Sequence, residues 1–78
     1  METRYNFTAT IRSLIDGTKR TLLVSVDGPM RTSSPKAFNS ALHAVYDQLR
    51  SDEMIIGLVL NNREYFDSRG YLIAKSVY

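Results

Sequence analysis

The chain has 78 residues, of which 44% are hydrophobic, ten are Lys or Arg and eight are Asp or Glu. This length makes one small domain, residues 1–78, and the hydrophobic content is typical of a folded protein. With no cysteine and a single histidine, the chain excludes disulfides, thiolate metal sites, cysteine nucleophiles and His-rich metal clusters. The net charge of +2 is too small to indicate a partner by itself.

The sequence shows no targeting segment and no membrane span. Residues 1–4 lack a basic stretch followed by an apolar one. The longest apolar run, residues 54–60, is far shorter than the ~20 residues that a bilayer-spanning helix needs. We therefore expect a cytoplasmic protein.

The first third of the chain predicts a β-hairpin. Apolar and polar residues alternate from Tyr5 to Arg12 and again in the segment 21–27, the period of two that is typical of strands. Asp16-Gly17 lies between them and suits a two-residue type I′ turn. The pairs that such a turn makes are Phe7 with Val26, Ala9 with Val24 and Ile11 with Leu22. All of these apolar side chains then share one face of the hairpin.

Residues 30–34 predict a linker, and the next segment predicts an amphipathic helix from Pro35 to about Arg50. Ser34 is a favourable N-cap, and proline is favourable at the first helical position. The apolar residues that recur at helical spacing are Phe38, Ala41, Leu42, Val45 and Leu49. This stripe is the face that we expect to pack on the sheet.

The last third predicts strands over 53–60 and 70–78. Arg63–Phe66 either extends a long hairpin that closes at Asp67–Gly70 or forms a short strand of its own. The predicted fold is α+β, one amphipathic helix on a four-stranded (possible fifth strand at Arg63–Phe66) antiparallel sheet in the order ββαββ. Its predicted core consists of Phe7, Ile11, Leu22, Val24, Phe38, Leu42, Val45, Leu49 and Leu58.

A second face of this sheet is predicted to be apolar. Simple alternation puts Ile56, Leu58 and Leu60 on one side of their strand and Ile55 and Val59 on the other. One helix covers only one face of a sheet. Either a partner covers the other face, as a second copy or a different protein, or twist and loops absorb the apolar residues.

Two clusters are candidate binding sites. Residues 63–71 are rich in arginine and tyrosine, the side chains most enriched at protein-binding hot spots. The predicted partner-binding residues are Arg63, Tyr65, Arg69 and Tyr71. A second cluster, a possible nucleic-acid or secondary contact, consists of Arg12, Lys19 and Arg20. The two clusters make a phosphate track only if they lie together, which depends on the strand order.

The sequence predicts no enzyme. His43 lies one helical turn before Asp47, on the face of the helix opposite the apolar stripe, where the two make a solvated pair. The carboxylates are dispersed, and no glycine-rich phosphate loop is present. We expect no cofactor, no metal and no small-molecule substrate.

Two functions are compatible with these features. The first is a non-enzymatic protein-binding module (an inhibitor, adaptor or subunit), acting through an apolar sheet face and the Arg/Tyr-rich hairpin. The second is a small nucleic-acid-binding domain that uses aromatic stacking and arginines. In size, absence of cysteine and ββαββ layout, the chain resembles some small phage-encoded inhibitors of host defence, the anti-CRISPR proteins among them. This resemblance favours protein binding and transfers no functional residue.

Overall fold

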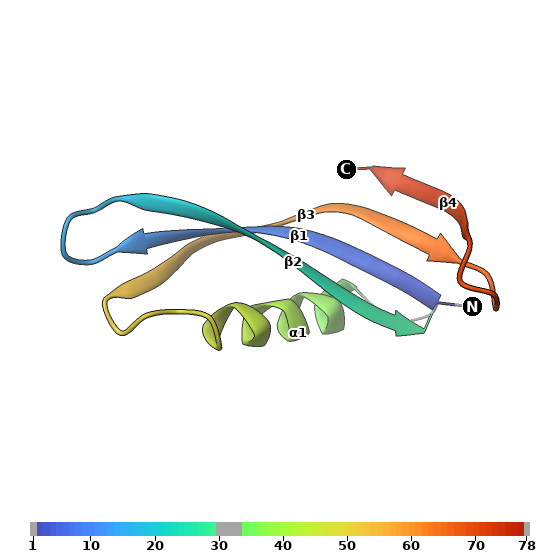
Figure 1. The fold of residues 1–78 in the computed structure, drawn as a ribbon, viewed down its shortest axis with the longest axis horizontal. Helices are drawn as coiled ribbons and strands as arrows, with labels where there is room; N and C mark the ends of the chain where they lie inside the picture. Colours follow the sequence, from blue (N-terminus) through green and yellow to red (C-terminus); the bar gives the residue numbers. More distant parts are fainter. Residues whose placement is uncertain (1, 30–33, 78) are drawn as a thin grey trace.

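The computed structural model describes residues 2–29 and 34–77 and has one helix on a four-stranded antiparallel sheet (Figure 1). Its elements are β1 (Glu2–Ser13), β2 (Lys19–Pro29), α1 (Ser34–Tyr46), β3 (Glu53–Phe66) and β4 (Leu72–Val77). The strand order is β2-β1-β3-β4. The α+β class and the ββαββ order are confirmed, and Arg63–Phe66 is the end of β3 rather than a fifth strand. The predicted linker lies, apart from Ser34, outside the described residues.

The hairpin of β1 and β2 is confirmed, but its predicted register is wrong by two residues. Phe7 pairs with Val24 instead of Val26, and Ala9 and Ile11 are displaced in the same way. A displacement of two residues keeps each side chain on its predicted face, because side chains alternate with a period of two. The apolar face of the hairpin is therefore the one that the sequence predicts.

The connection between β1 and β2 causes this difference, because it is longer than two residues. The Ser13 amide donates to the Thr18 carbonyl at 2.8 Å, which closes a loop over residues 14–17. Within these four described residues only Gly17 has a positive φ, 73°. A type I′ turn needs two, so that prediction is wrong. Asp16 instead accepts hydrogen bonds from the amide and hydroxyl of Thr18, which lower the pKa of its carboxyl group.

Two bulges in β3 explain why its sequence does not alternate. Opposite β1, the register changes at Ile56 and at Asn61, each of which lacks a direct cross-strand partner. As a result Ile55, Leu58 and Leu60 all pack against the core. The prediction that placed Ile55 on the other face from Leu58 and Leu60 is wrong, because it counted alternation through a bulged residue.

The helix covers one face of the sheet, called here the inner face; the opposite one is the outer face (Figure 1). Ala37, Ala41 and Val45, four residues apart, are fully buried and form the stripe that faces the sheet. The prediction that Phe38 lies in the core is wrong, because it is 39% exposed. Its ring lies at the margin of the stripe and contacts Phe7 edge-on, with the centroids 6.2 Å apart.

The core is small. Its buried apolar residues are Tyr5, Phe7, Ala9, Ile11, Val24, Ala37, Ala41 and Val45. The described parts of the chain extend over 46 × 19 × 19 Å, with a radius of gyration of 14.1 Å. A compact domain of this length has a radius of about 11.5 Å. The molecule is therefore elongated, and much of its apolar surface stays outside the core.

Candidate interaction surface

The outer face is built around the side chains of β1 that point away from the helix. Thr8 lies near the middle of β1 and is taken as the midpoint of the face; it pairs with Leu23 of β2 on one side and with Val59 of β3 on the other. Thr10 pairs with Thr21 and Gly57 in the same way. The face therefore consists of rows of residues across three strands, and each row can be followed from one edge toward the other.

Apolar side chains are exposed around this midpoint. Leu23 is 79% exposed and Val59 is 61% exposed. Met54 and the bulged Ile56 are also exposed on β3. We call these four residues, together with Gly57 among them, the outer patch. No other described element packs against it. An exposed apolar group of this kind on a small protein is typical of an interaction site.

Gly57 follows the bulged Ile56, but neither its backbone conformation nor a steric contact requires glycine there. It lies inside a central strand, where glycine costs about 0.5–1 kcal/mol relative to alanine. Its φ is not positive, and a Cβ there would meet Thr10 atoms at 3.8 Å, an ordinary contact. Glycine within a strand often marks a bulge, such as the one at the neighbouring Ile56, or a close approach by another backbone. Within the described residues, the chain itself supplies no such neighbour at this position.

A hydrogen-bonded polar network lies beside the patch. Asn6 accepts a hydrogen bond from Ser25 and donates to Asn62 and to Glu64, each at 2.6 Å. The bulged Asn61 donates to Thr8 at 2.5 Å. These bonds cross from β2 through β1 to β3 and fix the side chains of this half of the face. The surface is therefore pre-organised, which lowers the entropic cost of binding.

The two ends of the outer face carry different charges. Arg12 and Lys19, a cross-strand pair, are both exposed near the β1–β2 loop. At the other end, four residues from Thr8 along β1, Arg4 lies between its cross-strand partners Asp27 and Glu64. The loop end of the face thus carries two cations, with Asp16 and Asp52 close to Lys19, and the other end carries two carboxylates beside Arg4.

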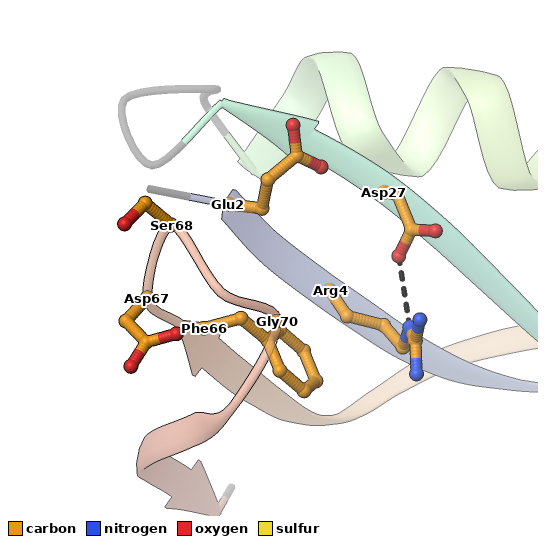
Figure 2. Close-up of a pocket in the computed structure, with 7 residues that line it drawn as sticks. All are labelled: Glu2, Arg4, Asp27, Phe66, Asp67, Ser68 and Gly70. Atoms are coloured by element: carbon orange, nitrogen blue, oxygen red, sulfur yellow. Dashed lines mark hydrogen bonds and ion pairs between the residues drawn. The ribbon is translucent and has the colours of Figure 1, made fainter.

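An open hollow of about 530 Å³ occupies the carboxylate end (Figure 2). Arg4 Nε donates to Asp27 Oδ1 at 2.8 Å, and its guanidinium lies 5.0 Å from the centroid of the Phe66 ring. The bond to Asp27 raises the pKa of Arg4. The other lining residues are Glu2, Asp67, Ser68 and Gly70. Since Asp67 accepts bonds from the amides of residues 69 and 71, it serves the turn.

The structure does not bring the four predicted partner-binding residues onto one surface. Arg63 pairs with the buried Tyr5 and lies over its ring at 5.4 Å, on the inner face. Tyr65, two residues further along β3, shares that face and is half-buried. Arg69 and Tyr71 are exposed in the turn between β3 and β4. Their role in binding stays a prediction, as does that of Arg63 and Tyr65.

The second predicted cluster is divided as well. Arg20 makes a two-pronged ion pair with Glu53, with N–O distances of 2.9 and 3.0 Å. Glu53 also accepts a hydrogen bond from the Arg50 amide. The bond from Arg20, followed by that from Arg50, lowers the pKa of Glu53 to about 2. Arg20, although also exposed, therefore links β2 to the start of β3, and Arg12 and Lys19 are the cations of this cluster on the outer face.

The two predicted clusters lie at opposite ends of the molecule. Ser13, next to the β1–β2 loop, pairs with Glu53 at the start of β3, whereas Glu2 pairs with Phe66 at its end. The β3–β4 turn therefore lies at the far end of the sheet (Figure 1). The condition for a continuous phosphate track is not met by this arrangement.

Sequence reasoning missed Leu23 and Gly57. Leu23 occupies an outward position in the alternation of β2, where its neighbours Thr21 and Ser25 are polar. That mismatch was the available signal. Gly57 becomes informative only once the outer face and the absence of a clash at its Cβ are known.

Comparisons with known proteins supply no family. No protein-family model matches the chain, and neither a curated protein nor a solved structure shows significant similarity to it. Among residues 2–29 and 34–77, no group of His, Asp or Glu could hold a metal ion. No helix in the same ranges is long and apolar enough to cross a membrane.

Proposed function

We propose that this chain is a small non-enzymatic protein-binding module whose main binding surface is the outer patch. The observation that carries the proposal is the exposure of Leu23, Val59 and their neighbours around Gly57, where a Cβ would fit. Burying such apolar side chains contributes roughly 25 cal/mol per Å² of area removed from water. An inhibitor, an adaptor or a subunit, including a phage-encoded inhibitor of a host defence complex, would use the surface in this way.

The β3–β4 turn supplies a second contact in this proposal. Arg69 and Tyr71 are exposed there, and both are residue types enriched at hot spots. The turn itself is held by Asp67 and by Gly70, whose φ of 85° suits glycine. Alanine at both Arg69 and Tyr71 should weaken partner binding by about 2 kcal/mol without unfolding the protein.

Binding of single-stranded nucleic acid is the alternative function. The wide separation of the basic clusters and the engagement of Arg20 by Glu53 count against it. A titration of DNA and RNA at low salt distinguishes the two functions, because phosphate contacts weaken steeply as salt rises. We expect no binding at low salt. Micromolar binding that salt abolishes would favour the nucleic-acid function instead.

The experiment that tests the proposal compares wild type with Val59→Asp as immobilised baits for proteins of the native host. Asn39→Asp is the matched control, because it adds the same charge at an exposed position on the helix. We expect association with protein by wild type and Asn39→Asp, and its loss in Val59→Asp. Equal association by all three, with intact folds, would remove the outer patch as the binding surface.

A further inference from the structure

We propose that the occupant of the outer patch is a second copy of this chain, packed face to face with its strands antiparallel. This inference rests on the proposed function, since it names the partner of the same surface. In this arrangement a two-fold axis lies between the two sheets, parallel to both of them and perpendicular to the strands. It passes over Thr8. Three independent features of the outer face support this arrangement.

The first feature is self-complementarity of the apolar residues. Rotation about this axis superposes the row of Thr8 on itself, so that Leu23 meets Leu23 and Val59 meets Val59 of the second copy. In a two-fold interface the same patch serves both subunits. Leu23 and Val59, the most exposed apolar side chains of the patch, are thus buried against their own copies, whereas Met54 comes over Glu64 of the second copy.

The second feature is charge. The rotation exchanges the rows four residues either side of Thr8, about 13 Å away along the strands. It therefore brings Lys19 of one copy over Asp27 of the other, and Arg12 over Arg4, which is flanked by Asp27 and Glu64. Lys75, paired with Glu64, and Arg69 in the β3–β4 turn are further cations near this end, and Glu2 and Asp67 add two more carboxylates. The attractive contact of Lys19 with Asp27 forms twice in each dimer.

The third feature is Gly57. It lies in the row of Thr10, which the rotation brings over the row of Asn6, so that Gly57 faces Asn62 of the second copy. Its missing side chain leaves room there for the Asn62 side chain.

The test uses charge reversal at one contact of this arrangement. Lys19→Glu puts two carboxylates together at each end of the dimer, and Asp27→Lys puts two ammonium groups together. When the two variants are mixed, the carboxylate introduced by the first meets the ammonium group introduced by the second at one end of the dimer. The native pair of Lys19 and Asp27 forms at the other end. The mixture therefore restores both attractive contacts.

Sedimentation velocity over a range of concentrations measures the outcome. We expect wild type to approach twice 8.9 kDa, each variant alone to dimerise at least about tenfold more weakly, and the equimolar mixture to recover wild-type affinity. Circular dichroism checks the fold of each variant, since Asp27→Lys also removes the exposed ion pair with Arg4. A mixture that dimerises no better than its components would overturn the arrangement.

Two further results separate this inference from the proposed function. A wild-type protein that stays at 8.9 kDa up to several hundred micromolar overturns the dimer. If Val59→Asp then still abolishes capture of a different protein, the binding function of the patch stands without the dimer. If Val59→Asp changes neither mass nor capture, both fail.

Discussion

The two faces of this sheet are made by the same strands, yet they differ in almost every property. The inner face contributes Tyr5, Phe7 and Ile11 to a core that α1 covers, and these side chains are almost completely buried. The outer face carries polar residues along β1, with exposed apolar residues on the strands that flank it. The core of the chain therefore lies on the inner face, and the exposed apolar residues of the outer face need another explanation.

The bulges are the device that separates the two faces. In β3, Ile55 and Leu58 lie three residues apart, a spacing that would put them on opposite sides of a regular strand. The bulge at Ile56 brings both to the inner face. Val59 and Met54 are the main apolar residues that remain on the outer face of β3. The register of the strand places them there, and not a lack of room in the core.

The largest expected effect comes from the inner face. Phe7→Ala should destabilise the protein by about 3–5 kcal/mol, because it removes a buried ring that contacts Phe38 and leaves a cavity under the helix. Urea unfolding followed by circular dichroism measures the change. Such a loss is comparable to the whole stability of a protein of this size. Phe7→Leu, which removes less of the side chain, is therefore measured beside it. A change below about 1 kcal/mol for Phe7→Ala would contradict the assignment of the core.

The same substitution at two adjacent residues, Ile55 and Ile56, tests whether the bulge puts Ile55 against the core and leaves Ile56 exposed. Ile55→Thr should cost about 1–2 kcal/mol, because it places a hydroxyl group against the core. Ile56→Thr should change stability by less than about 0.5 kcal/mol, because Ile56 is exposed. Both substitutions keep a β-branched side chain. Unfolding experiments that gave the reverse order would restore simple alternation and refute the bulge.

A smaller effect is expected from the ion pair at the end of the sheet. The pKa of Glu53 is lowered from its ordinary 4.5 to about 2, chiefly by the bond from Arg20. The folded state therefore binds fewer protons than the unfolded state in this range, and the stabilisation is present above pH 4.5 and lost as the pH falls toward 2. Glu53→Gln should flatten the acid dependence of the unfolding midpoint between these values. An unchanged slope would show that other carboxyl groups, such as Asp16, account for it.

The smallest effect on stability is expected at Gly57. Gly57→Ala should stabilise the isolated chain by about 0.5 kcal/mol, since a Cβ fits and the unfolded chain loses freedom. The same change should weaken association through the outer patch, because the added methyl group takes the room left for Asn62 of the second copy. Thermal unfolding at low concentration and sedimentation at high concentration measure the two effects separately. A variant that associates as wild type does would show that Gly57 marks no close approach.

Much of the fold could be predicted from the sequence, because alternation and helical spacing report directly on burial. The faces of β1, β2 and α1 follow from the positions of residues such as Phe7, Val24 and Val45. The hairpin register and the faces of β3 could not be predicted, because loop length and bulges add residues that no periodicity reveals. The candidate site was predicted only in outline. Arg63 and Tyr65 lie on the inner face because β3 continues through them as one strand.

The measurement that tests the central claim most directly is sedimentation equilibrium of wild type and Val59→Asp, from about 1 to 300 µM. Val59 is exposed, so the substitution should leave the monomer folded. We expect the wild-type mass to rise from 8.9 kDa toward twice that value, whereas Val59→Asp stays at 8.9 kDa throughout. Equal masses for the two proteins at every concentration would contradict it.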